Sequence, residues 1–343
     1  MSVQRVDEAK DADVANQEVT YATAFQQAVR EEMERDDRVF VLGTDLAERG
    51  GHFAQVKGLS AIFGRERIRD TPISEAAMVA AGVGAALYGM RPIVDLNFME
   101  FSFGAMDEIV NQAAKMRYMF GRSVPLVIRG TSGVALSGAQ HNNCIETWFA
   151  QTPGLAVAVP STPFDVKGLL KSALRGEDPV IFMMHKRLSG VKGPVGDAST
   201  LVPFGSASVC RRGDRCTIVT YGANVRKALL AADELAGGGV ETEVVDLRTL
   251  YPLDTATVLE SVARTRRCVA LDEGPLLYSV ASELAALVQG ELFDVLAAPV
   301  ARLSGRRAPT PFSPPLIEAN LPQTDDIVRA VESTLTARSR ANS

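Results

Sequence analysis

The sequence is poor in the residue types from which redox and metal sites are built. Its 343 residues contain one tryptophan, three histidines and four cysteines. No two cysteines stand in C-x-x-C spacing, so the sequence predicts neither a redox pair nor a zinc knuckle. We interpret the cysteines as buried or half-buried thiols of a reducing compartment. The histidines are too few and too scattered for a histidine-built metal site. The residues concerned are Cys144, Cys210, Cys216, Cys268, His52, His141 and His185.

An excess of charge of one sign and a long apolar run are also missing. Lys plus Arg number 36 and Asp plus Glu number 41, which leaves a net charge of −5. A mildly acidic chain has no electrostatic footprint for a polyphosphate, so we expect no nucleic-acid partner. The longest run of small apolar residues, 76–90, has 15 residues with three glycines and is too short to cross a bilayer. The polar N-terminus contains no signal-peptide run. We therefore expect no membrane partner and a cytoplasmic protein.

Common nucleotide and nucleophile motifs are absent as well. The sequence contains no G-x-x-x-x-G-K-[ST] loop and no G-x-S-x-G elbow. Gly82-Val-Gly84 begins like a dinucleotide fingerprint but lacks the third glycine and lies inside a predicted helix. We interpret these glycines as positions of close packing.

Short β-branched runs alternate with helix-length segments, which predicts βαβ units and parallel sheets. At about 150 residues per domain the length indicates two domains. In the first half, strands are predicted at 39–42, 92–96, 125–128, 156–159 and 180–183, with helices at 21–35, 74–88, 104–119 and 163–175. In the second half, strands are predicted at 217–220, 243–246, 268–271 and 300–303, with helices at 224–236, 254–264, 279–289 and 324–337.

The expected fold class is α/β, with two doubly wound domains. We place a flexible N-terminus at 1–16, the first domain at 17–188, a linker at 189–203 and the second domain at 204–338. Residues 309–322 hold five prolines, so we predict an extended surface strap there. Thr324 is expected to cap the last helix.

Three motifs resemble a known family. They are Arg69-Asp-Thr-Pro-Ile-Ser-Glu75, Pro92-Ile-Val-Asp-Leu-Asn-Phe-Met-Glu-Phe101, and Ala139-Gln-His141 followed by Cys144 and Trp148. With segments 111–121, 152–175 and 244–254 they resemble the beta subunit of the thiamine-diphosphate-dependent decarboxylase component of 2-oxo acid dehydrogenase complexes, of the pyruvate, acetoin or branched-chain type. The similarity covers residues 19–335. It implies a transketolase pyrimidine-binding domain followed by a transketolase C-terminal-like domain.

The resemblance implies an oxidoreductase that is active only with an alpha subunit, in a heterotetramer of two alpha and two beta chains. In this family a GDG…N motif of the alpha subunit holds the diphosphate and its magnesium, and no GDG triplet occurs here. The implied reaction decarboxylates or cleaves a small 2-oxo acid or acetoin. The acyl group then passes to lipoamide on a dihydrolipoamide acyltransferase core.

Glu75 is the residue that the resemblance assigns to the aminopyrimidine of the cofactor. A carboxyl group bonded to the pyrimidine nitrogen favours the imino tautomer, which accepts the proton of the thiazolium carbon. Glu75 follows Ser74, which we expect to cap a helix, so the carboxylate would face the positive end of that helix. On the residues alone, a first-turn glutamate that only complements the helix dipole is the alternative.

Phe101 and His141 complete the set of implied site residues. Phe101 matches a phenylalanine that packs on the pyrimidine ring, and an ordinary core phenylalanine is the alternative. His141 follows the glycine-bearing loop 130–138, on the side of a parallel sheet where ligands bind. It matches a histidine that assists acyl transfer to lipoamide, since imidazole titrates near neutral pH. A structural histidine is the alternative. We treat His52 and His185 as structural.

Some relatives bind potassium, mainly through backbone carbonyls. The matching positions here are Leu126, Ala173, Leu174, Gly176 and Asp178. Gly176 stands where the family has an acidic residue, and a solvated turn is the alternative.

Two segments depart from the family pattern. Gly43-Thr44-Asp45-Leu46 replaces G-E-D/E-V, so the first acid, implicated in the proton path between paired active sites, is missing. Residues 185–190 differ from the Glu-Asn…Leu-Tyr pattern that is common in the family, and we expect the substrate range to differ as a result. This second departure favours, as an alternative, a split transketolase-like carboligase acting outside a multienzyme complex. A non-catalytic assembly subunit is the other alternative.

Overall fold

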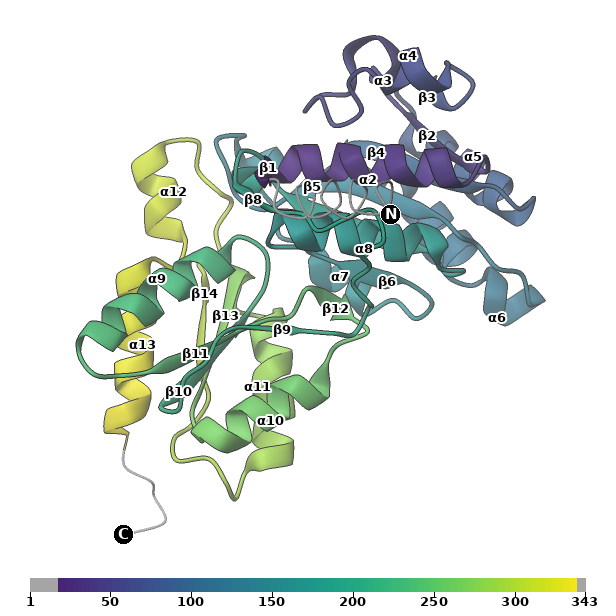
Figure 1. The fold of residues 1–343 in the computed structure, drawn as a ribbon. Helices are drawn as coiled ribbons and strands as arrows, with labels where there is room; N and C mark the ends of the chain where they lie inside the picture. The colour runs from purple at the N-terminus through teal and green to yellow at the C-terminus, as the bar shows by residue number, and fades with distance from the viewer. Residues whose placement is uncertain (1–17, 338–343) are drawn as a thin grey trace, which may run out of the picture. The chain divides into compact units, whose positions relative to one another are not determined.

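The computed structural model describes residues 18–337, which form two compact units (Figure 1). The first contains the described residues up to Thr131 together with Trp148–Phe204. The second contains Ser132–Thr147 and the described residues from Gly205 onward. The compact units differ from the predicted domain boundaries because Ser132–Thr147 joins the second unit. The predicted flexible N-terminus, 1–16, lies outside the described residues.

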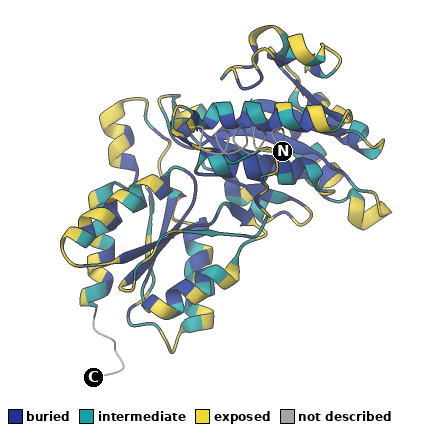
Figure 2. Ribbon diagram, viewed as in Figure 1, coloured by how far each residue is buried: buried dark blue, intermediate teal, exposed yellow. Residues whose placement is uncertain are grey.

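The first unit is built on a parallel sheet whose strands follow the order β6-β7-β5-β4-β2-β3. The pairs β2–β3, β2–β4, β4–β5 and β6–β7 all run parallel. Strands β2, β5 and β7 are buried along their whole length, as strands covered by helices on both faces must be (Figure 2). The strands are β2 Val39–Gly43, β3 Ile68–Asp70, β4 Arg91–Phe98, β5 Val127–Ser132, β6 Ala156–Ala158 and β7 Val180–His185.

Helices α2 and α8 pack against each other in the first unit, and the sequence predicts both to the residue. Each begins where a threonine side chain accepts a backbone N–H: Thr20 from Thr23, and Thr162 from Asp165. Buried Glu32 of α2 binds Arg175 of α8 at 2.6 Å. The helices of this region are α2 Tyr21–Arg35, α3 Leu46–Arg49, α4 Leu59–Phe63, α5 Glu75–Leu87, α6 Met116–Phe120, α7 Glu146–Ala150 and α8 Pro163–Arg175.

The helix predicted over 104–119 is present as helical structure but is not one regular α-helix. The chain there forms a 3-10 segment η1 (Met99–Ala105), a π-helical segment η2 (Glu108–Ala113) and then α6. The backbone of this region is tightly held, because a Cβ added at Gly154 would lie 1.9 Å from the carbonyl oxygen of Ala114. The helical periodicity of the sequence does not distinguish a regular α-helix from one interrupted by 3-10 and π segments.

The predicted linker also contains structure. Within it, β8 (Lys192–Pro194) pairs antiparallel with β1 (Glu18–Thr20). Two strands of three residues each are too short to leave an alternating pattern in the sequence.

The second unit is a five-stranded sheet of order β14-β13-β10-β11-β9, with helices on both faces (Figure 1). Its central pairs are parallel, and only the edge strand β9 runs antiparallel. Helices α9 and α13 pack together over a core that contains Ile218, Val244 and Leu271. The strands of this sheet are β9 Ser208–Arg211, β10 Cys216–Thr220, β11 Thr242–Asp246, β13 Cys268–Pro275 and β14 Ala301–Gly305. The short strand β12, Thr249–Tyr251, is not part of it. The helices are α9 Asn224–Gly237, α10 Thr255–Thr265, α11 Val280–Leu292, α12 Pro314–Asn320 and α13 Thr324–Thr336.

Two predictions for the C-terminal region are wrong in detail. The proline-rich segment 309–322 is not extended throughout, because Pro314 and Pro315 start helix α12. The cap of α13 is Gln323, whose side chain accepts the backbone N–H of Asp326 while the Asp326 carboxylate accepts that of Gln323. Among residues 18–337, no helix is long and apolar enough to span a membrane.

Candidate active site

The carboxyl ends of β4, β2 and β3 lie side by side at one edge of the first unit's sheet, because these strands are neighbours and parallel. In open α/β sheets ligands bind beyond this edge. The residues that follow the strands supply the candidate site: Thr44 and Asp45 after β2, Glu75 after β3, and Phe101 after β4.

Glu75 is the first residue of α5. Its side chain is half-buried and, within residues 18–337, has neither a hydrogen-bond nor an ion-pair partner. Ser74 occupies the N-cap position, but its hydroxyl makes no capping bond, so the predicted cap is absent. The positive end of α5 therefore faces a carboxylate that is left available to an incoming donor.

Phe101 lies on η1, and η1 packs directly against α5. The structure thus brings together the two elements that carry Glu75 and Phe101. The Phe101 ring meets the Phe98 ring edge-on, with centroids 5.9 Å apart. This T-shaped contact fixes the orientation of the half-buried Phe101 ring.

Phe98 is the centre of an aromatic cluster that sequence reasoning did not identify. The rings of His52 and Phe53 lie 5.4 and 5.7 Å from that of Phe98. The ammonium group of Lys186 lies 5.5 Å from the same ring and 3.8 Å from the Glu100 carboxylate. Lys186 directly follows strand β7, and this position at the end of a strand is the feature of the sequence that could have identified it.

A cavity of about 370 Å³ opens beside this cluster. Its wall is polar and strained: Asp45, Ala54 and Asn97 have φ values of 59°, 55° and 61°. Non-glycine residues rarely adopt such values, and they are concentrated at functional sites. No sequence signal marks these positions, since none is glycine. The cavity is lined by Thr44, Asp45, Arg49, Gly51, His52, Phe53, Ala54 and Asn97.

A buried ion pair holds this edge of the sheet in place. Arg129 on β5 donates to both carboxylate oxygens of Asp95 on β4 at 3.1 Å, and Gln55 donates to Asp95 at 2.7 Å. Asp95 also accepts the backbone N–H of Asn97 at 2.8 Å. Each of these three side chains is buried, so the network fixes the strained backbone at Asn97.

His141 belongs to the second unit, within the short 3-10 turn Ala139–His141. The side chain of Asn142 bridges its loop, accepting from the backbone N–H of Ala135 and donating to the Ala135 carbonyl, both at 2.8 Å. Thr310 donates to the carbonyl of Asn142 at 3.0 Å. The imidazole is half-buried on a loop that is well anchored. The predicted partnership of His141 with Glu75 and Phe101 stays a prediction.

Four of the five backbone carbonyls predicted for potassium already accept a hydrogen bond from the protein. The carbonyl of Leu126 accepts from Val180, and that of Ala173 accepts from Gly176. Arg91 donates to the carbonyls of Leu174 and Gly176. The Asp178 side chain is paired with Arg117.

Comparison with known proteins agrees with this arrangement. Residues 17–191 match the family described as transketolase, pyrimidine binding domain, and residues 205–327 match transketolase, C-terminal domain. The chain is 42% identical to the 2-oxoisovalerate dehydrogenase subunit beta of Bacillus subtilis (strain 168), covering 91% of this chain and 97% of that one. It is 44% identical to the acetoin:2,6-dichlorophenolindophenol oxidoreductase subunit beta of Cupriavidus necator, with coverage of 91% and 96%. Against a mitochondrial pyruvate dehydrogenase E1 component subunit beta-1 of Arabidopsis thaliana the identity is 42%, with coverage of 91% and 88%.

The chain belongs to the beta subunits of 2-oxo acid dehydrogenases. A solved structure titled split gene transketolase, inactive beta4 tetramer, has the same fold, with a TM-score of 0.79. That likeness covers 94% of this chain and 100% of that one at 24% identity.

For a beta subunit of this family the cofactor implied is thiamine diphosphate. The residues present fit the pyrimidine end of such a group, because Glu75 offers a carboxylate that has no partner among residues 18–337, beside the element that carries Phe101. They do not fit potassium, because a guanidinium already occupies two of the five carbonyls. Among residues 18–337, no cluster of three His, Cys, Asp or Glu side chains is arranged to hold a metal ion.

The remaining histidine, His185, and the cysteines have the surroundings expected of structural residues, except for Cys210. His185 is buried, and its Nδ1 accepts the backbone N–H of Arg187. Cys216 and Cys268 are buried as predicted, and burial raises the pKa of Cys216 to about 12. Cys210 is exposed, which contradicts the prediction for that residue, because it lies on the edge strand β9.

Proposed function

We propose that this chain is the beta subunit of a thiamine-diphosphate-dependent dehydrogenase acting on a small 2-oxo acid or on acetoin. The observation that carries this proposal is the Glu75 carboxylate. It lies at the start of α5, has no partner in the part of the chain that the structure describes, and stands beside the segment that bears Phe101. Relatives named for 2-oxoisovalerate, acetoin and pyruvate are similarly close, at 42, 44 and 42% identity, so identity alone does not choose among these substrates.

The proposed active site is shared with an alpha subunit, in a heterotetramer of two chains of each kind. The sequence has no GDG triplet, so we assign the diphosphate and its magnesium to the alpha subunit. The cytoplasmic location stays a prediction.

When bound, the cofactor would supply a carbon nucleophile for the substrate carbonyl. Glu75 would hold a proton at the pyrimidine nitrogen and so favour one tautomer of the ring. Phe101 would pack on that ring, and Phe98 orients the Phe101 side chain. His141 carries a proton during transfer of the acyl group to lipoamide of a dihydrolipoamide acyltransferase.

The alternative, a split transketolase-like carboligase, draws on residues 185–190. In this segment Lys186 pairs with Glu100 beside the aromatic cluster. The sequence of the segment differs from the pattern common in the family. Carbon–carbon bond formation without reduction of added lipoamide would favour it. A non-catalytic assembly subunit would require that Glu75 be dispensable.

The test is the Glu75→Gln variant, purified with its alpha subunit. Proton transfer by a positioned side chain contributes roughly 10²- to 10⁴-fold, so we expect turnover to fall at least about 100-fold. The matched control is Glu283→Gln, because Glu283 is likewise a glutamate in the first turn of a helix, α11. We expect that control to keep its turnover. Near wild-type turnover of Glu75→Gln in an assembled complex would refute the proposed role.

A further inference from the structure

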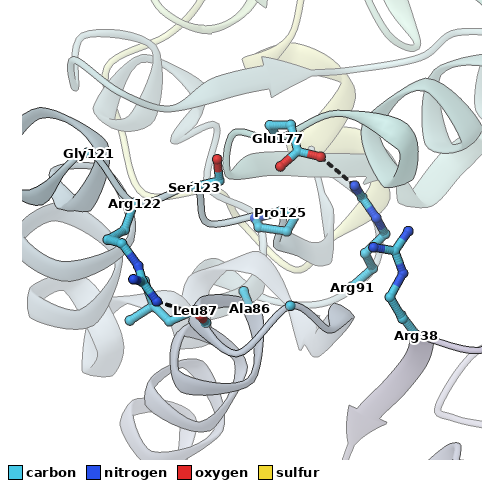
Figure 3. A pocket seen from close by; sticks show the side chains of 10 residues that line it. Arg38, Ala86, Leu87, Arg91, Gly121, Arg122, Ser123, Pro125 and Glu177 are labelled. Atoms are coloured by element: carbon cyan, nitrogen blue, oxygen red, sulfur yellow. Dashed lines mark hydrogen bonds and ion pairs between the residues drawn. The ribbon is translucent and has the colours of Figure 1, made fainter.

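Arg91 is a buried arginine at the start of β4, where it borders a surface pocket of about 310 Å³. Figure 3 shows its guanidinium reaching Glu177, while Arg122 lies across the pocket beside Leu87. Arg38 also borders the pocket. Of these three arginines only Arg91 is buried, since Arg38 and Arg122 are exposed.

The guanidinium of Arg91 binds the C-terminal end of helix α8. Its Nη1 donates to the carbonyls of Leu174 and Gly176 at 2.9 and 2.6 Å. Its Nη2 pairs with the Glu177 carboxylate, and its Nε lies 3.9 Å from the carboxylate of Asp36. The last carbonyls of a helix have no intrahelical donor and carry the negative end of the helix dipole. Arg91 therefore supplies both the donors and the positive charge that this helix end requires.

These two carbonyls belong to the set expected for potassium from the family resemblance. A potassium ion bound there would share both oxygens with a guanidinium and would lie close to its charge. Glu177 and Asp36 already balance Arg91, and Gly176 brings no carboxylate to balance a second cation. Four of the five expected carbonyls thus already accept a hydrogen bond, two of them from Arg91, and the nearby carboxylates are already paired with arginines.

We propose that Arg91 replaces an alkali cation at the end of α8, so that this protein needs no potassium for stability. A guanidinium tethered to the chain cannot dissociate, whereas a bound ion exchanges with the solvent. The inference concerns the stability of the first unit and is independent of the substrate and of the role of Glu75.

The test is the thermal unfolding midpoint of the full chain in potassium, sodium or tetramethylammonium chloride at equal ionic strength. We expect the same midpoint in all three salts, because no step of folding takes up a potassium ion. A midpoint raised selectively by potassium would overturn the proposal. This readout does not involve activity, so it is separate from the test of Glu75.

Variants locate the effect at Arg91. We expect Arg91→Met to lower the midpoint by several degrees, because it leaves two carbonyls and Glu177 without their partner. The control is Arg122→Met, which removes an exposed arginine from the same pocket. The Arg122 side chain makes a long hydrogen bond, 3.3 Å, to the carbonyl of Leu87. The midpoint of this control should stay that of the wild type. An Arg91→Met midpoint equal to that of the wild type would contradict the proposal. If Arg91→Met does not fold, the unfolding midpoints of the wild-type protein in the three salts still test the proposal.

Discussion

At the scale of single residues, the chemistry of this protein depends on which polar groups are satisfied internally. Asp95, fully enclosed, has partners in Arg129 and Gln55, whereas the Glu75 carboxylate has none within the described residues. The identity of Glu75 as a site residue could be predicted, because its motif is distinctive in the sequence. The cavity beside His52 could not be, because Asp and Asn adopt left-handed φ values in many ordinary turns, so Asp45 and Asn97 do not single out a site, and Ala54 has no residue type that favours such a value.

A buried pair in the second unit illustrates the same principle. Tyr221 donates to Asp272 at 2.9 Å, and the backbone N–H of Gly274 donates to the same carboxylate oxygen at 3.0 Å. Burial raises the pKa of Asp272 despite these donors, and burial together with the Asp272 charge raises the pKa of Tyr221. Because the folded-state pKa of Asp272 is raised, its contribution to stability is present at low pH and is lost as the pH rises through that pKa.

We therefore predict that Tyr221→Phe destabilises the protein in a pH-dependent way. Removing a donor from a buried carboxylate costs about 1–3 kcal/mol of unfolding free energy. The loss should be largest at neutral pH and smaller in acid, where Asp272 is protonated. Urea unfolding of the variant and the wild type at both pH values measures the difference. A deficit that does not change with pH would mean that Asp272 does not titrate in this range.

At the scale of elements, the bounds of α2 and α8 were predicted to the residue. In the structure each of these helices starts at a threonine cap, and Pro163 stands at the first helical position of α8. The caps predicted at Ser74 and Thr324 are absent. The segment η1–η2–α6 did not follow, because its 3-10 and π geometry depends on neighbours such as Gly154, distant in sequence. Strands β1 and β8 exist only through pairing with each other.

The cap of α13 provides a test at this scale. We predict that Gln323→Ala lowers the unfolding free energy by about 1 kcal/mol, because the variant loses the side chain that caps the helix. Thr324→Ala is the control, since Thr324 is already inside the helix and makes no cap. Its effect should stay within about 0.5 kcal/mol. Equal losses in chemical denaturation of the two variants would favour Thr324 as the capping residue.

At the scale of the whole molecule, the two units correspond to two transketolase-type domains joined in one chain. The division differs from a simple split of the sequence, because Ser132–Thr147 packs within the second unit. Val134 of that segment contacts Ile317 and Leu321, and Glu273 accepts its backbone N–H. The match to the pyrimidine binding domain, residues 17–191, includes this loop, whereas the first compact unit does not, so the predicted domain boundary stays a prediction.

The central claim is that this chain supplies only half of a cofactor site. Titration calorimetry of thiamine diphosphate with magnesium tests it most directly, using the chain alone and the chain assembled with its alpha subunit. We predict tight binding by the assembled protein and none by the chain alone. Glu75→Gln should weaken binding in the assembly. Equally tight binding by the chain alone would contradict the account, because a complete diphosphate site would then reside within these 343 residues.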